Sequence, residues 1–187
     1  PDAGRLLASA NEGLSRKLCA IEYASTATVN LVYDRRRTAG LPEAAGFVVP
    51  AIEGRTLLAC TFADQKFEGR AAADKTVIRA FVGGDLSEES LELPDQQMVD
   101  AVRHDLAELT GLDAVPLHTV IERHRDAMPQ YQMGHLERVS RIEAATDGIP
   151  ALGLAGNYFQ GPGIPDCIER AEKTACGLFQ ELFGTTG

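Results

Sequence analysis

Short runs of β-branched and aromatic residues dominate the first 85 positions of the chain. They cover residues 21–33, 46–50, 56–62 and 76–82, and they stop at turn-forming residues such as Asp34, Pro50 and Gly83. Runs of this composition and length predict β-strands. Because the last three runs are joined by short connections, one of them through Glu53-Gly54, we expect an antiparallel meander.

Apolar residues spaced three or four positions apart predict helices at residues 3–18, 95–110, 134–146 and 165–183. Asp95 is a suitable N-cap for the second of these helices, and Gly111 is a suitable stop. Residues 115–124 and the apolar run 150–155 predict two further strands. Because strands cluster early and helices follow later, the sequence predicts an α+β fold with a mostly antiparallel mixed sheet and flanking helices.

The amino-acid composition argues for some classes of protein and against others. The chain has 187 residues, of which 44% are hydrophobic and 24% charged, and this suits one sizeable core. A net charge of −9 argues against nucleic-acid binding, and no apolar run reaches the length of about 20 residues that spans a bilayer. The first residue is not methionine, so we expect that an upstream segment has been removed.

The spacing of the cysteines and histidines points to neither a redox-active thiol pair nor a metal site. The four cysteines form no CxxC pair, so we expect mostly buried, reduced thiols in a cytoplasmic protein. The four histidines do not repeat at the spacing of metal ligands, and we expect no metal site.

The most informative local feature is a predicted strand, glycine-rich turn and helix at residues 150–183. Gly156, Gly161 and Gly163 can take positive φ and let the backbone approach a ligand. A helix that begins near Pro165 presents free N–H groups at its positive end, which suits a phosphate or an electron-rich cofactor edge. The pattern also suits an ordinary turn with a capped helix. Asp166 stands where a dinucleotide fingerprint has its third glycine.

Three segments together resemble the C-terminal half of protoporphyrinogen oxidases, within the monoamine-oxidase-like flavoproteins. They are residues 46–84, AMPQYQMGHLERV at 127–139, and LAGNYFQGPGIPDCIERA at 154–171. The resemblance implies an FAD enzyme of haem biosynthesis that converts protoporphyrinogen IX to protoporphyrin IX in three two-electron rounds, with molecular oxygen as the final acceptor. It implies a porphyrinogen-binding portion at 1–133 and the end of an FAD-binding domain at 134–187. The GxGxxG half is absent from the sequence, so we expect the chain alone to be inactive.

The resemblance also implies site residues. The backbone of Pro162, Gly163 and Ile164 is expected to face the flavin ring, while Ala45, Val48 and Phe81 are expected to line the porphyrinogen cavity. If Phe81 faces the cavity, strand alternation turns Arg79 the same way, where it suits a substrate propionate; the alternative is an arginine that faces solvent. No catalytic side chain is expected, because flavin carries the redox chemistry.

Some positions depart from the family pattern, and other functions also fit the sequence. His124 stands where the family often has tryptophan near the flavin, Tyr131 is expected near the cofactor side of the cavity, and His135 is expected to begin a helix. Alternative functions are oxidation of coproporphyrinogen III, another flavin oxidase such as an amine oxidase, and a non-catalytic interaction module. Self-association and peripheral contact with a membrane are also left open.

Overall fold

The computed structural model describes residues 1–85, 87–159 and 161–184. The chain forms two compact units, unit 1 from Pro1–Tyr23 and Met128–Gly187, and unit 2 from Ala24–Ala127. It passes from unit 1 to unit 2 in β1 (Tyr23–Asp34) and returns in β5 (His118–Pro129). These units are defined by packing, whereas the division expected at residues 133 and 134 is functional and stays a prediction.

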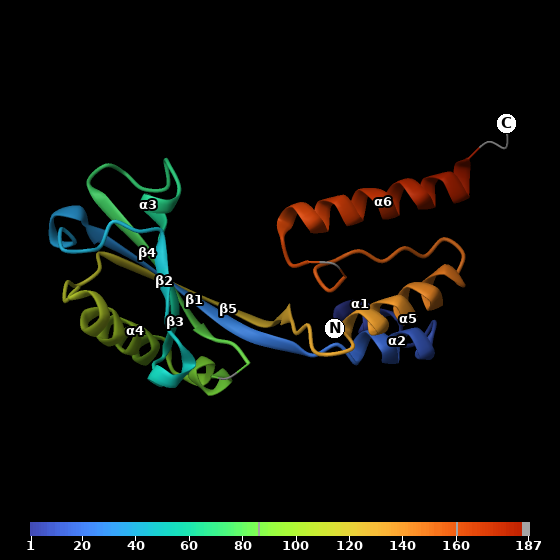
Figure 1. Cartoon of the computed structure of the whole chain (residues 1–187), viewed down its shortest axis with the longest axis horizontal. Coiled ribbons are helices and arrows are strands. Elements are labelled where there is room, and N and C mark those ends of the chain that lie inside the picture. Colours follow the sequence, from blue (N-terminus) through green and yellow to red (C-terminus); the bar gives the residue numbers. More distant parts are fainter. Residues whose placement is uncertain (86, 160, 185–187) are drawn as a thin grey trace. The chain divides into compact units, whose positions relative to one another are not determined.

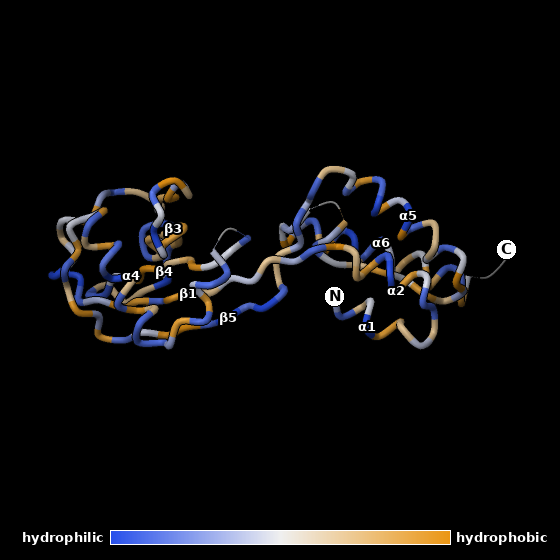
Figure 2. Tube along the Cα trace, turned by 90° about the horizontal axis from the view of Figure 1, so that it is seen from below, coloured by the Kyte–Doolittle hydropathy of each residue, from blue (hydrophilic) through white to orange (hydrophobic). Residues whose placement is uncertain are grey.

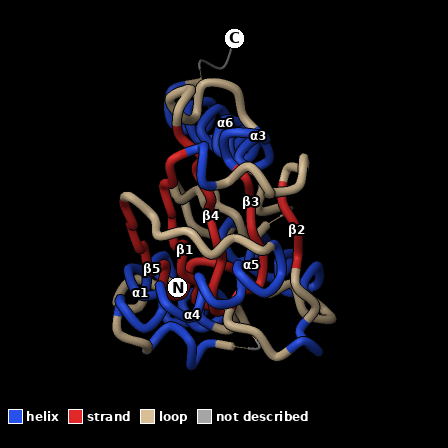
Figure 3. Tube along the Cα trace, turned by 90° about the vertical axis from the view of Figure 1, so that its left-hand side faces the viewer, coloured by secondary structure: helices blue, strands red, loops and turns tan. Residues whose placement is uncertain are grey.

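Unit 2 is built on a five-stranded sheet in the order β2-β3-β4-β1-β5, and Figure 3 shows these strands side by side. The remaining strands are β2 (Gly46–Val48), β3 (Leu57–Phe62) and β4 (Lys75–Gly83). The β2–β3, β3–β4 and β4–β1 pairs are antiparallel, so the predicted meander and the α+β class are confirmed. Short connecting helices are α3 (Ala63–Lys66) and 3₁₀ turns at Arg35–Arg37, Ala51–Glu53 and Glu88–Glu92.

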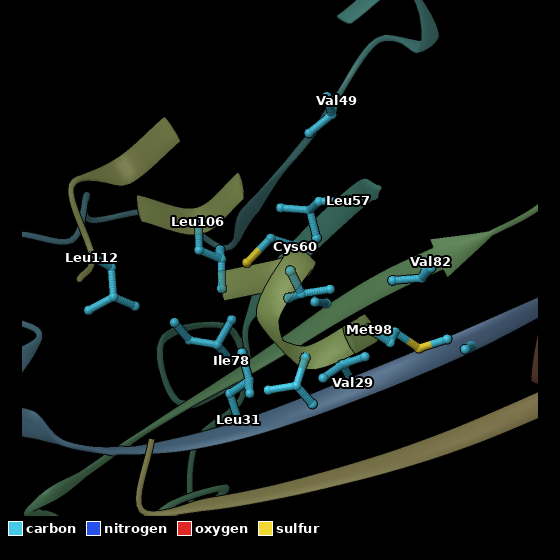
Figure 4. Packing of buried hydrophobic residues seen from close by; sticks show 14 of the residues in the cluster. Val29, Leu31, Val49, Leu57, Cys60, Ile78, Val82, Met98, Leu106 and Leu112 are labelled. Atoms are coloured by element: carbon cyan, nitrogen blue, oxygen red, sulfur yellow. The ribbon is translucent and has the colours of Figure 1, made fainter. Parts of the chain in front are cut away.

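Helix α4 (Asp95–Thr110) packs against one face of this sheet, as Figure 1 shows. Alternation along β1 buries Ala27, Val29, Leu31 and Tyr33, while the residues between them stay half-buried. Figure 4 shows Val29 of this strand beside Met98 of α4. The buried cluster also includes Leu57, Cys60, Phe62, Ile78, Ala80, Val82, Met98, Val102 and Leu106.

The ends of α4 differ partly from expectation. Gly111 ends the helix with φ +75°, as predicted. The prediction that Asp95 is the N-cap is wrong, because Pro94 holds that position and Asp95 is the first helical residue. The Asp95 carboxylate instead accepts a hydrogen bond from Arg123 Nη1 at 2.6 Å, which ties the helix start to β5.

A buried carboxylate joins α4 to the sheet. Asp105 Oδ2 accepts from the backbone N–H of Leu57 at 2.9 Å, and its side chain is almost fully buried. Arg55 Nη1 lies 3.4 Å from Asp105 and 2.5 Å from the exposed Glu108, and its hydrogen bond lowers the pKa of Glu108. Asp105 therefore provides the hydrogen-bond acceptor for a strand N–H that is buried away from solvent.

Unit 1 is helical, with α1 (Asp2–Leu7), α2 (Glu12–Cys19), α5 (His135–Asp147) and α6 (Ile164–Phe183). Its core comprises Leu14, Leu18, Ile21, Val139, Ile142, Tyr158 and Phe159. The single helix predicted at 3–18 is wrong. The Asn11 side chain accepts from Leu14 N at 2.9 Å and caps a second helix there, so the first helix has to end earlier.

The predicted strand at 150–155 is also wrong. Ala151 has φ +60°, which interrupts an extended run, and among the described residues no strand pairs with this segment. The segment packs beside α6 instead. A Cβ at Gly153 would lie 2.5 Å from Thr174 and 2.7 Å from Leu178, so only glycine allows this approach.

The expectation that the thiols are mostly buried is wrong in part. Cys60 is buried, Cys167 is half-buried, and Cys19 and Cys176 are exposed. Burial raises the pKa of the Cys60 thiol to about 12, consistent with an inert core residue. In the part of the chain that the structure describes, every helix is too short or too polar to cross a bilayer.

We expect Asp105→Ala to lower the free energy of unfolding by about 1–3 kcal/mol, because it leaves the buried N–H of Leu57 without an acceptor. Glu108→Ala removes only the exposed partner of Arg55 and should cost less than about 1 kcal/mol. Urea unfolding followed by circular dichroism measures both. Equal losses in the two variants would contradict this account of Asp105.

Candidate functional site

Helix α6 begins with uncapped N–H groups. Gly163 is its N-cap with φ −65° and ψ 142°, Pro165 lies in the first turn, and no side chain caps the helix. Cys167 N donates to Gly163 O at 3.0 Å, whereas the N–H groups of Ile164 and Asp166 have no acceptor among the described residues. These donors stand at the positive end of a 20-residue helix and suit an anionic or electron-rich group.

The glycines of this turn act differently from the prediction. Of the three, only Gly156 has positive φ, at +153°. A Cβ at Gly161 or Gly163 would lie 2.6 or 2.7 Å from Asp166 Oδ2, so these two glycines leave room for that carboxylate. Asp166 is exposed and lies in the first helical turn, where a negative charge interacts favourably with the helix dipole.

Two segments that lie far apart in the sequence meet beside this turn. The Tyr131 hydroxyl donates to the carbonyl of Asn157, and the Tyr131 ring stacks on His135 with ring centroids 4.4 Å apart. Burial, together with the nearby Cys167 and Asp166, raises the pKa of Tyr131. These contacts therefore join the segment around Tyr131 and His135 to Asn157 within unit 1.

His135 begins α5, as predicted, and is buried. Its Nε2 lies 2.8 Å from the carbonyl oxygen of Tyr158, so Nε2 carries the proton of that hydrogen bond. Nδ1 is buried and finds no partner among the described residues. This arrangement connects α5 to the 157–159 segment, and it gives His135 a structural role.

The face of the sheet opposite α4 carries a row of small and apolar side chains. The strand register places Val48 of β2 beside Ala59 of β3, Ala59 beside Phe81 of β4, and Phe81 beside Thr28 of β1. Val48 is 79% exposed and Phe81 is half-buried. We call Val48, Ala59, Phe81 and Thr28 the apolar row.

A second row, which we call the polar row, runs next to it on the same face and consists of Thr61, Arg79 and Asn30. Gly46 pairs with Thr61, Thr61 with Arg79, and Arg79 with Asn30. Arg79 is exposed, and its Nε donates to Asn30 Oδ1 at 2.9 Å. The structure therefore places Arg79 on the same face as Phe81, as strand alternation predicts.

Two other residues singled out in the sequence lie outside both rows. Ala45 precedes β2, is exposed, and accepts from Phe62 N through its carbonyl at 3.0 Å. His124 is an exposed residue of β5. The substrate and cofactor roles of all the residues named from the sequence stay predictions.

The polar row contains residues that sequence reasoning missed. Asn30 and Thr61 come from different strands than Arg79, and only the register brings them beside it. Asn157 and Asp166 are likewise defined by contacts across a turn. Strand alternation finds the face of a residue but not its neighbour on the next strand.

Known proteins resemble this chain over most of its length. A family model described as flavin containing amine oxidoreductase matches residues 5–178. The coproporphyrinogen III oxidase of Bacillus subtilis (strain 168) is 32% identical over 142 residues, covering 75% of this chain and 30% of the relative. The chloroplastic protoporphyrinogen oxidase of Nicotiana tabacum is 28% identical over 148 residues, covering 77% of this chain and 27% of the relative.

A solved structure supports the fold. The crystal structure of a candidate protoporphyrinogen oxidase from Exiguobacterium sp. 255-15 is similar with a TM-score of 0.74 and 31% identity, over 87% of this chain and 36% of that chain. The chain spans about a third of the length of the curated relatives it matches.

We expect Gly156→Ala to destabilise unit 1 by about 1–3 kcal/mol, because alanine rarely adopts its φ. Its Cβ would also lie 3.2 Å from the Tyr158 ring. Gly163→Ala should cost less than about 1 kcal/mol, because only the exposed Asp166 carboxylate has to move aside. Thermal unfolding by circular dichroism compares the two. A larger loss in Gly163→Ala would show that the turn is held differently.

Proposed function

Because this chain belongs to the flavin-containing amine oxidoreductases, we propose that it supplies the porphyrinogen-facing sheet and one flavin-facing turn of an FAD-dependent oxidase. The observation that carries the proposal is the apolar row, an open set of side chains that includes Val48 and Phe81, two of the three positions at which the family resemblance expects the macrocycle. Support also comes from the names of the relatives, which are porphyrinogen oxidases.

The turn before α6 fits a flavin ring in its donor chemistry. The backbone of Pro162, Gly163 and Ile164 would hold the ring, and the free N–H groups of Ile164 and Asp166 would favour negative charge on it. FAD, when bound, supplies the hydride acceptor. The Asp166 carboxylate beside Gly161 and Gly163 is exposed and can turn away from the ring.

Further parts of the cofactor site are proposed to lie in the portion of the relatives that this chain does not span. Helix α6 supports this, because none of its residues is buried and large apolar side chains stay exposed on it. These are Ile164, Ile168, Phe179, Leu182 and Phe183. In a larger flavoprotein, such side chains would be covered by neighbouring structure.

The proposed reaction removes six hydrogens from a porphyrinogen in three two-electron rounds, with molecular oxygen taking the electrons and protons from the reduced cofactor. On this chain, the apolar row would hold the flat macrocycle through Val48 and Phe81 and exclude water from one of its faces. We propose that the protein works in the cytoplasm.

Two porphyrinogens are candidates for the substrate. Protoporphyrinogen IX carries two propionates and matches the printed names of the tobacco relative and of the Exiguobacterium structure. Coproporphyrinogen III carries four propionates and matches the names of the Bacillus and Staphylococcus aureus relatives, which are 32% and 30% identical to this chain. The number of carboxylates separates the two substrates chemically.

The 187-residue chain should not retain FAD through gel filtration, and it should not oxidise a porphyrinogen when FAD is added, because the proposed site is incomplete in it. Absorption spectra of the eluted protein and porphyrin fluorescence measure the two outcomes. A yellow protein with flavin bands would contradict the proposed division of the cofactor site.

The apolar row should bind a porphyrin even in this chain. We expect Val48→Ser to weaken protoporphyrin IX binding about five- to tenfold, because it removes an exposed apolar contact at the edge of the row. Val115→Ser is a matched control, since Val115 is 60% exposed and lies outside the strands. Fluorescence titration gives both affinities. An equal effect in the two variants would place the porphyrin elsewhere.

A further inference from the structure

We propose that Arg79, held by Asn30, is a carboxylate-binding site that recognises the propionate groups of the substrate. The inference rests on the proposed function and deepens it, because it names the residue that binds the carboxylates at the edge of the macrocycle. The observation behind it is the side-by-side placement of the polar row and the apolar row on one open face.

Arg79 differs from most arginines of unit 2 in having no acidic partner. Six others form ion pairs with carboxylates, namely Arg35, Arg36, Arg55, Arg103, Arg123 and Arg125. Within the described residues, the side chain of Arg79 forms no ion pair and hydrogen-bonds only to the neutral amide oxygen of Asn30. Its charge is therefore uncompensated in a chain of net charge −9.

The contact with Asn30 also orients the guanidinium. Nε donates to Asn30 Oδ1 at 2.9 Å, which fixes one edge of the plane and leaves Nη1 and Nη2 for a ligand. Two parallel N–H groups match the two oxygens of a carboxylate. Thr61, the β3 partner of Arg79, adds a half-buried side chain with a hydroxyl donor on the other side. Asn30 is thus a positioning residue, and Arg79 is the binding residue.

The spacing suits a macrocycle with acidic arms. Arg79 and Phe81 are two residues apart on β4, so their Cα atoms lie about 7 Å apart along the strand. A macrocycle that covers Phe81 would bring a flexible propionate arm within reach of the guanidinium. A substrate with four carboxylates has more ways to place one there than a substrate with two, so the site favours coproporphyrinogen.

The test compares two probes on the full 187-residue chain, coproporphyrin III and its tetramethyl ester, which differ only in the carboxylates. Fluorescence titration gives the ratio of the two affinities. Wild type should prefer the acid, and Arg79→Gln should weaken acid binding about five- to tenfold while it leaves ester binding unchanged. The preference should also shrink as salt is raised.

Asn30→Asp provides a second variant with almost the same shape. It places a carboxylate on Arg79 in place of the neutral amide, so the acid preference should fall as it does in Arg79→Gln, and circular dichroism should show the fold intact. Arg37→Gln is the control, because Arg37 is exposed, lacks an ion pair among the described residues, and lines a hollow with Gly111 and Leu112 away from both rows.

The outcomes separate the two proposals. If neither probe binds wild type, the proposed porphyrin surface fails, and the role of Arg79 fails with it. If both probes bind but the ratio is the same in wild type, Arg79→Gln and Asn30→Asp, only the carboxylate site is overturned. If Arg37→Gln lowers the ratio as much as Arg79→Gln, the preference reflects overall charge, and the site is likewise overturned.

Discussion

The strand register of the sheet in unit 2 is the constraint on which the rest depends. Antiparallel pairing of β3, β4 and β1 sends alternate side chains to opposite faces, and a shift of one residue would exchange the two sets. The buried set packs on α4, which determines the register. Packing of the buried set therefore also fixes which side chains lie on the open face. Phe81 and Arg79 face outward because Ile78, Ala80 and Val82 face inward.

Hydropathy follows the same division. Figure 2 shows β5 mostly in hydrophilic colours, as expected for a strand in which only Ile121 packs partly against the core. Arg123 of β5 donates to the carbonyls of Leu91 and Leu93 at 3.0 and 2.7 Å, so this edge is held by hydrogen bonds more than by apolar contact. The apolar row spans β2, β3, β4 and β1 and does not extend to β5.

Periodicity in the sequence predicts much of this fold, including the five strands β1 to β5, the meander, α4, α5 and α6. It also predicts that Arg79 shares a face with Phe81, because alternation is a local property. It does not give the partner Asn30, because register depends on packing between strands. The broken helix at residues 8–11 follows from the Asn11 cap, and the missing strand at 150–155 from the φ of Ala151 and the lack of a pairing strand among the described residues. In both places the local periodicity predicts the wrong element, because a side-chain contact or a single backbone angle determines the structure there.

The central claim is that one face of the sheet, and not the other, receives a macrocycle. Nuclear magnetic resonance of the chain titrated with coproporphyrin III tests it directly, because the porphyrin ring current shifts the signals of nearby protons. The account predicts shifts concentrated on Val48, Ala59, Phe81 and Thr28, with Val29, Ile78 and Ala80 on the buried face unaffected. Shifts that are spread over both faces, or that gather away from these strands, would contradict it.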